Sequence, residues 1–260
     1  MTVTLAATEY GAGKPVAILH GLFGSARNWA GIAQRLAGRY RVIAFDLRNH
    51  GTSPWADWMD YAAMAEDVRM AMAAHGHRRF ALIGHSMGGK AAMVLALSDP
   101  DTVERLVVVD IAPMPMAAPF LGLIRAMRGL DLGTITRRRD ADVALADAIP
   151  DPAERAFLLQ SIVFDDGQPR WQLNLAALEA ALPTIAGFPS FPAGTHYDGP
   201  TLFVGGGKSD LLPPSAAPEI RSLFPRATIE LIADAGHWVH AEQPAGFLTL
   251  VEPFLAADAD

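Results

Sequence analysis

The chain of 260 residues contains no cysteine. Disulfide bonds, thiolate metal sites and a cysteine nucleophile are therefore excluded. Positive charge is also scarce, because 21 lysine and arginine residues face 28 aspartate and glutamate residues, which leaves a net charge of −7. This balance gives no basic surface for nucleic acid or for an anionic membrane, so we expect neither as a partner.

Long hydrophobic runs are absent as well. No stretch approaches the roughly 18 consecutive apolar residues of a membrane span, and residues 1–7 lack a basic leader. We therefore expect a soluble, cytoplasmic protein that is a monomer or a homodimer. Hydrophobic residues make up 51% of the chain and charged residues 19%, which is typical of a globular protein with a sizeable core.

Short apolar runs alternate with helix-like segments at both ends of the chain. The runs have no polar alternation, which is typical of parallel strands buried on both faces. Strands are predicted at residues 16–19, 41–45, 80–83, 106–109, 201–204 and 228–232. Helices are predicted at residues 27–37, 61–75, 90–97, 216–223 and 246–255.

The middle of the chain interrupts this alternation. Between residues 114 and 195 there are helical periodicity and many chain breakers, but no convincing strand. We predict an α/β fold with a mostly parallel central sheet flanked by helices, formed by residues 1–112 and 196–260. Residues 113–195 are predicted to form a helical cap above the carboxyl edge of the sheet, where ligands bind in open α/β folds.

A glycine-rich motif, Gly84-His85-Ser86-Met87-Gly88, lies between a predicted strand and a predicted helix. A strand, then G-x-S-x-G, then a helix is a nucleophile elbow, a sharp turn that raises a serine hydroxyl above the end of a sheet. The motif alone can arise by chance. Its placement between strand and helix predicts that Ser86 is a nucleophile.

A serine nucleophile needs a histidine base, and the histidine needs an acid that holds its tautomer. The expected chain order is serine, acid, histidine, which leaves His196, His237 and His240. His237 comes just after the last predicted strand, at the same sheet edge as Ser86. It is therefore the predicted base.

Acyl transfer also needs N–H donors for the oxyanion that forms on the carbonyl. The residue after the nucleophile, Met87, supplies one. The second is expected from the loop that follows the strand at 16–19, where Leu22 is favoured and Phe23 is the alternative.

Apolar residues of the predicted cap and of the last loop are candidates for a substrate pocket. Methionine has a flexible thioether that suits a pocket for several acyl shapes, although packing between cap helices is the alternative for any single residue. The predicted lining is Met114, Met116, Phe120, Leu121, Ile124, Met127, Trp171 and Trp238. Arg137, Arg138 and Arg139 are interpreted as a solvated face, with contact to a coenzyme A phosphate as the alternative.

Over nearly its whole length the sequence resembles the α/β-hydrolases, and among them the YbfF-like and ABHD-type esterases. The motifs that carry the resemblance are at residues 20–25, 46–51, 84–90, 109–113, 170–175 and 235–240. It is weakest at residues 114–165. The resemblance implies hydrolysis of carboxylic esters, and of acyl thioesters in some members, without a cofactor or a metal.

Two carboxylates could be the acid. Asp210 follows the penultimate strand, the commoner place for the acid in this superfamily. However, Ser209 occupies the position that matches the acid, and Asp210 comes one residue late. The esterases that the chain resembles likewise have a serine there and keep an aspartate after the preceding strand, which matches Asp110. We predict Asp110 as the acid and keep Asp210 as the alternative.

The sequence therefore predicts a serine hydrolase that cleaves small-molecule carboxylic esters with short to medium acyl chains through an acyl-enzyme intermediate. Acyl-CoA thioesterase, perhydrolase and carbon–carbon bond hydrolase activities also use a serine and stay as alternatives. A ligand-binding protein without activity is a further alternative, because the fold alone does not fix the function.

Overall fold

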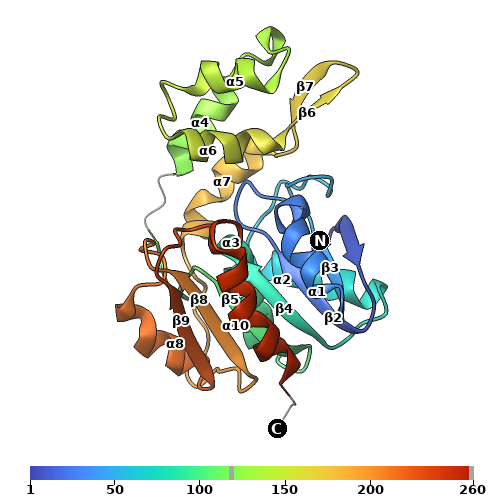
Figure 1. The fold of residues 1–260 in the computed structure, drawn as a ribbon, viewed down its shortest axis with the longest axis vertical. Helices are drawn as coiled ribbons and strands as arrows, with labels where there is room; N and C mark the ends of the chain where they lie inside the picture. Colours follow the sequence, from blue (N-terminus) through green and yellow to red (C-terminus); the bar gives the residue numbers. More distant parts are fainter. Residues whose placement is uncertain (117–119, 258–260) are drawn as a thin grey trace.

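The computed structural model describes residues 1–116 and 120–257, and within these residues a sheet of seven strands forms the centre of the molecule (Figure 1). Its order is β1-β3-β2-β4-β5-β8-β9, and every neighbouring pair is parallel except β1 with β3. The strands are β1 (Ala7–Tyr10), β2 (Lys14–Leu19), β3 (Tyr40–Phe45), β4 (Phe80–His85), β5 (Val103–Val109), β8 (Thr201–Gly206) and β9 (Ala227–Ile232). This is the mostly parallel sheet that the sequence predicts.

Helices cover both faces of the sheet, because successive side chains of its inner strands point to opposite sides and both sets are apolar. On β2, Ala17 and Leu19 belong to the hydrophobic cluster on one face of the sheet, whereas Val16 and Ile18 belong to the cluster on the other face. The helices of this core are η1 (Ala26–Trp29), α1 (Ala30–Leu36), α2 (Tyr61–Ala74), α3 (Met87–Ser98), η4 (Pro214–Ala216), α8 (Ala217–Leu223), α9 (Val239–Glu242) and α10 (Pro244–Ala256).

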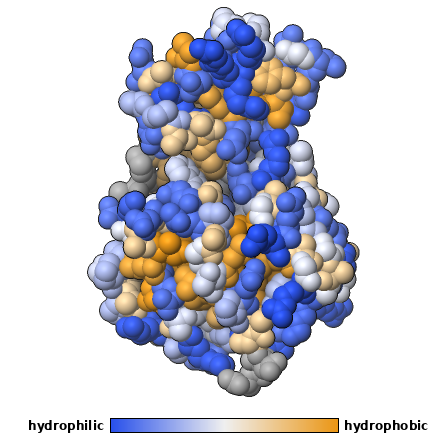
Figure 2. Space-filling view, viewed as in Figure 1, coloured by the Kyte–Doolittle hydropathy of each residue, from blue (hydrophilic) through white to orange (hydrophobic). Residues whose placement is uncertain are grey.

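A second layer, which we name the cap segment (residues 120–186), lies beyond the carboxyl ends of the strands (Figure 1). It contains α4 (Phe120–Gly129), η2 (Leu132–Thr134), α5 (Arg138–Leu145), α6 (Pro152–Leu158), η3 (Leu159–Ser161), β6 (Ile162–Asp165), β7 (Gln168–Trp171) and α7 (Leu175–Ala186). Figure 2 shows a narrower waist between this segment and the sheet layer. The domain boundaries at 113 and 195 stay a prediction.

The structure corrects the expectation that residues 114–195 contain no strand. β6 and β7 pair as an antiparallel hairpin, joined by Asp166 and Gly167 with positive φ angles of 49° and 80°. Asp-Gly is the usual sequence for the tight turn of a hairpin. The four-residue strands and a proline at 169 hide this signal from an analysis of hydrophobic periodicity.

The sequence analysis also missed β1, which pairs with β3 at the edge of the sheet. Its residues are mostly exposed, so it has no apolar run to mark it. In the described part of the chain, no helix has the length and apolar character needed to cross a membrane.

Candidate active site

Ser86 sits on a sharp turn between β4 and α3. Its backbone has φ 51° and ψ −116°, a conformation that L-residues rarely adopt and that holds the serine under strain. The flanking glycines make the turn possible. A Cβ on Gly84 would lie 2.3 Å from the carbonyl oxygen of Gly88, and a Cβ on Gly88 would lie 2.5 Å from that of His20. The strand, turn and helix thus place Ser86 at the carboxyl edge of the sheet, as the motif predicts.

His237 and Asp110 meet at the same edge. His237 follows β9, and its Nδ1–H donates to Oδ2 of Asp110 at 2.7 Å. This bond holds the ring in the tautomer whose Nε2 is free to accept a proton. His237 and Ser86 line one cavity, so an imidazole and a hydroxyl share the same space.

The carboxylate of Asp110 is completely buried and is held by three donors. Besides His237, the backbone N–H of Gly206 donates to Oδ1 at 2.8 Å and the hydroxyl of Ser209 donates to Oδ2 at 2.5 Å. Burial of a charge is costly unless hydrogen bonds compensate for it, and these donors do so. Asp210 is exposed on the same loop, and within the described residues it makes no hydrogen bond to His237. The structure therefore brings Asp110, and not Asp210, to the histidine.

Two buried histidines lie behind His237, and sequence reasoning gave them no role. Nε2–H of His85 donates to the backbone carbonyl of His237 at 2.9 Å, and the two ring centroids are 4.5 Å apart. His240 stacks on Trp29 with ring centroids 3.9 Å apart. These contacts fix the loop that carries His237. The elbow motif leaves the residue before the serine open, so no signal in the sequence points to His85.

The backbone N–H groups that the sequence analysis expects to hold an oxyanion lie on the loop after β2 and at the start of α3. The N–H of Phe23 donates to Nε2 of His50 at 3.3 Å, and Nδ1–H of His50 donates to the carbonyl of Arg48 at 2.9 Å. The Phe23 amide is therefore already engaged. Met87 lies in the first turn of α3, where N–H groups have no acceptor within the helix, and Leu22 lines the cavity beside Ser86.

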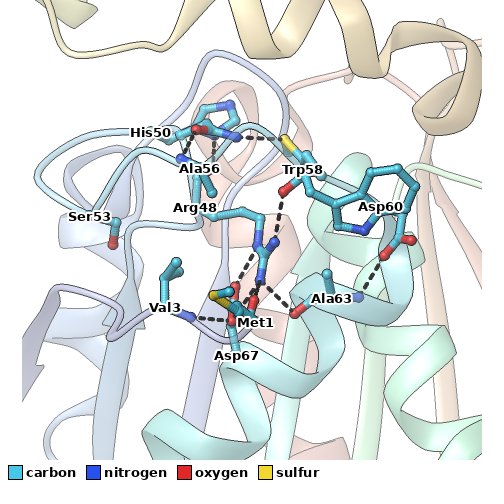
Figure 3. Close-up of polar contacts among 12 residues, drawn as sticks. Met1, Val3, Arg48, His50, Ser53, Ala56, Trp58, Asp60, Ala63 and Asp67 are labelled. Carbon is cyan, nitrogen blue, oxygen red and sulfur yellow. Dashed lines mark hydrogen bonds and ion pairs between the residues drawn. The ribbon is translucent and has the colours of Figure 1, made fainter.

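The loop at residues 46–51 holds neighbouring segments together through polar contacts (Figure 3). The buried guanidinium of Arg48 makes a two-point ion pair with Asp67, with Nε–Oδ2 and Nη2–Oδ1 distances of 2.6 and 2.8 Å. It also donates to the carbonyl of Trp58 at 2.7 Å. Asn49 accepts hydrogen bonds from the side chain and the backbone N–H of Asn174. The loop thus connects α2, the loop after β2 and the cap segment.

The buried histidines lead to a prediction about acid stability. Burial lowers the pKa of His50 and of His240 to about 3, and it also lowers the pKa of His20 and of His85. Below about pH 6.5 the unfolded chain therefore binds protons that the folded chain excludes, so the free energy of unfolding falls as pH falls. We expect a loss of roughly 1 kcal/mol per histidine per pH unit between pH 6.5 and 5.5, measured by urea unfolding.

His240→Gln should reduce the dependence of the unfolding free energy on pH. The matched variant His196→Gln changes an exposed histidine and should leave this dependence unchanged. An unfolding free energy that stays constant from pH 7.5 to 5.5 would show that the folded chain takes up as many protons as the unfolded chain, which would contradict the lowered pKa values.

Two adjoining cavities flank Ser86 within the described residues, and Leu22 and Phe120 line both. The first has a volume of about 370 Å³, and its other lining residues are Phe23, His85, Leu123, Glu154, Phe157, Leu158, His237 and Trp238. The second has a volume of about 270 Å³, and its other lining residues are Tyr61, Met87, Met116, Leu182, Ile185 and Ala186. Most of these side chains are apolar.

The predicted pocket lining is revised by this arrangement. Of the predicted residues, Met116, Phe120 and Trp238 line the cavities. Three of the others lie on α4, which turns them away from the cavities: Ile124 and Met127 are fully buried within the hydrophobic core, and Leu121 is 37% exposed. Met114 is 36% exposed before α4 begins, and Trp171 is buried at the end of β7. The helical repeat of α4 thus determines which of its apolar side chains face the cavities, and composition alone does not reveal this.

Comparison with known proteins places the chain among the hydrolases. A family model described as "alpha/beta hydrolase fold" matches residues 14–244. The sn-1-specific diacylglycerol lipase ABHD11 of Danio rerio is 42% identical over 253 residues, which are 94% of this chain and 79% of that protein. Esterase YbfF of Escherichia coli is 36% identical over 246 residues, 93% of each chain. A solved structure named "Marine microorganism esterase" has a TM-score of 0.94 and 35% identity, and covers 98% of this chain and 100% of that one.

These matches confirm the resemblance to YbfF-like and ABHD-type esterases that the motifs indicate. The matches extend over nearly the whole chain, and the solved esterase structure has the same fold as this protein. The chain therefore belongs to the α/β-hydrolase family and is a carboxylic ester hydrolase.

Proposed function

We propose that the protein hydrolyses uncharged carboxylic esters through a covalent acyl-enzyme on Ser86, with His237 as the base and Asp110 as the acid. One observation carries this proposal. The 2.7 Å hydrogen bond from His237 to the buried Asp110 orients a histidine that lines the same cavity as the strained Ser86. These are the three roles that acyl transfer to serine requires.

The reaction follows from these positions. Ser86 Oγ attacks the ester carbonyl carbon while Nε2 of His237 takes the hydroxyl proton, and the carbonyl oxygen becomes an oxyanion. The N–H groups of Met87 and Leu22 would hold this oxyanion. The engagement of the Phe23 amide by His50 supports Leu22 as the second donor. His237 then protonates the leaving alcohol, and it later activates the water that releases the acid from Ser86.

The charge of the cavity supports uncharged substrates. Glu154 is the acidic residue that lines it, and among the described residues its carboxyl group has no ion-pair partner. Burial, together with the nearby Asp151, raises the pKa of Glu154. A carboxylate in an apolar wall repels anionic substrates, because charges interact strongly where water is excluded. An acyl ester such as the lipid named for the zebrafish relative carries no charge of this kind.

Acyl-CoA thioesters fit this site less well. These thioesters carry phosphates, and the arginines at 137–139 were the candidates to bind them. Two of these arginines already have other partners. Arg138 donates to the carbonyls of Leu159 and Ile162, both at 2.8 Å. Arg137 pairs with Asp140. Thioester hydrolysis therefore has no specific support from the site.

A fluorophosphonate and an activated aryl ester test the proposed function together. We expect the fluorophosphonate to add covalently to Ser86, located by peptide mass spectrometry, and to abolish hydrolysis of p-nitrophenyl butyrate. The aryl ester should give a burst of nitrophenol when acylation is faster than deacylation. Hydrolysis that persists after complete labelling, or labelling of another serine, would contradict the assignment.

The cap segment should select the acyl chain, with short and medium chains preferred to bulky or charged ones. Phe120 lines both cavities beside Ser86, and its neighbour Leu121 points outward. Phe120→Ala should raise kcat/KM for an octanoate relative to a butyrate by about tenfold, because pocket volume is worth this much per chain extension. Leu121→Ala is the matched control and should leave the ratio unchanged. Equal ratios in both variants would show that α4 does not select the acyl chain.

A further inference from the structure

Lys90 is a buried cation that the proposed chemistry does not use. It lies on α3, one helical turn after Ser86, and is completely buried. Within the described residues its ammonium group pairs with no carboxylate. Nζ donates instead to the backbone carbonyls of Gly187 and Ala186, at 2.7 and 3.3 Å. A buried charge must have such partners, so these contacts are the reason that a lysine can occupy this position.

The carbonyls belong to the end of the cap helix α7. The preceding carbonyl, that of Ile185, accepts a hydrogen bond from the hydroxyl of Tyr61 at 2.6 Å. Nζ of Lys90 lies 5.9 Å from the centroid of the Tyr61 ring. Two core side chains thus occupy three consecutive carbonyls at a helix C-terminus, where a positive charge also compensates for the helix dipole.

The same residues form one wall beside the nucleophile. Tyr61, Ile185 and Ala186 line the cavity of about 270 Å³ that reaches Ser86. Any movement of the α7 end changes the shape of this cavity. Lys90 therefore connects the helix that carries Ser86 to the wall opposite it.

We propose that Lys90 is a positioning residue for substrate selection: with Tyr61, it holds the end of α7 against α3 and so fixes the acyl-chain wall beside Ser86. This inference rests on the proposed esterase function. It differs from selection by Phe120, because Lys90 acts through the backbone of α7 and has no contact with the acyl chain.

The contacts of Lys90 and Tyr61 with the end of α7, which we name the clamp, should respond to pH. Burial lowers the pKa of Lys90 to about 8. The titratable group that faces it from α2 is Tyr61, whose pKa burial raises, so the phenol stays neutral in this range. α7 presents backbone carbonyls alone at the contact, and α3 carries no other charged side chain. A neutral amine binds carbonyls less strongly than an ammonium group, so the wall should loosen as pH rises through 8.

The test is the ratio of kcat/KM for p-nitrophenyl octanoate to that for the butyrate between pH 6.5 and 9.5. Any pH dependence of the catalytic steps that both substrates share cancels in this ratio. We expect the ratio to rise with a midpoint near pH 8 in the unaltered protein. In Lys90→Met it should be about tenfold higher at pH 7 and independent of pH. Lys14→Met, at an exposed lysine, is the matched control and should behave as the unaltered protein does.

A flat ratio in the unaltered protein, or a Lys90→Met ratio equal to that of Lys14→Met, would overturn the clamp. If Lys90→Met fails to fold, Tyr61→Phe removes one hydroxyl donor only, and it should raise the ratio while keeping the midpoint near pH 8. Hydrogen exchange of the peptide at residues 183–190 is independent of activity and should be faster in either variant. If no ester is hydrolysed, the proposed function fails, and unchanged exchange at this peptide separately rejects the clamp.

Discussion

Ser86→Ala is expected to abolish ester hydrolysis and to leave the protein folded. The hydroxyl is the proposed nucleophile, and removal of a nucleophile that works with a base usually lowers kcat by several orders of magnitude. The side chain is small, and alanine meets the same backbone strain at φ 51° as serine does. The rate with p-nitrophenyl butyrate should therefore fall below about a hundredth of the parent value, while the urea midpoint stays nearly constant.

The two measurements separate chemistry from folding. A variant that keeps both its stability and more than about a hundredth of the activity would reject Ser86 as the nucleophile. A variant that loses activity together with stability would indicate that the turn itself depends on the hydroxyl.

Asp110→Asn is expected to lower kcat by roughly ten-thousandfold. Asparagine keeps the shape of aspartate, but its amide can donate to Nδ1 of His237 and favours the wrong tautomer, with the proton on Nε2. The matched variant is Asp210→Asn, which changes the exposed carboxylate that directly follows Ser209. It should retain nearly full activity.

The reverse result would move the acid to Asp210 while Ser86 and His237 keep their roles. Because Asp110 is fully buried and accepts three hydrogen bonds, its asparagine variant should also be compared by urea unfolding, and the rates measured where both proteins are folded.

The sequence predicts those parts of the candidate site that depend on local motifs and on the order of the strands. The elbow around Ser86 and the histidine after the last strand follow from motifs and from the order of strands, because parallel strands bring their carboxyl ends to one edge. The choice of Asp110 depended on the serine at 209, and in the structure that serine donates to Asp110.

The missed features depend on contacts between distant segments. Glu154 lies in the weakly matched middle of the chain, and its place in the cavity depends on how α6 packs above the sheet. In the sequence, Lys90 has no feature that distinguishes it from an exposed helix residue. In the structure it is buried and contacts the end of α7. The outward turn of Leu121 is likewise set by helix packing. Such positions are fixed by tertiary structure, which overrides local patterns.

The waist beneath the cap segment has a consequence for how this part of the chain can change during evolution. The backbone N–H of Met116 donates to the carbonyl of Ala186 at 2.9 Å, so the chain leaves the core and returns to it at nearly one point. Closing a longer excursion costs little more than closing a short one, since the entropy grows only with the logarithm of its length. Insertions and deletions above this junction can therefore accumulate without disturbing the sheet, and substrate range can diverge while the hydrolytic machinery below stays the same.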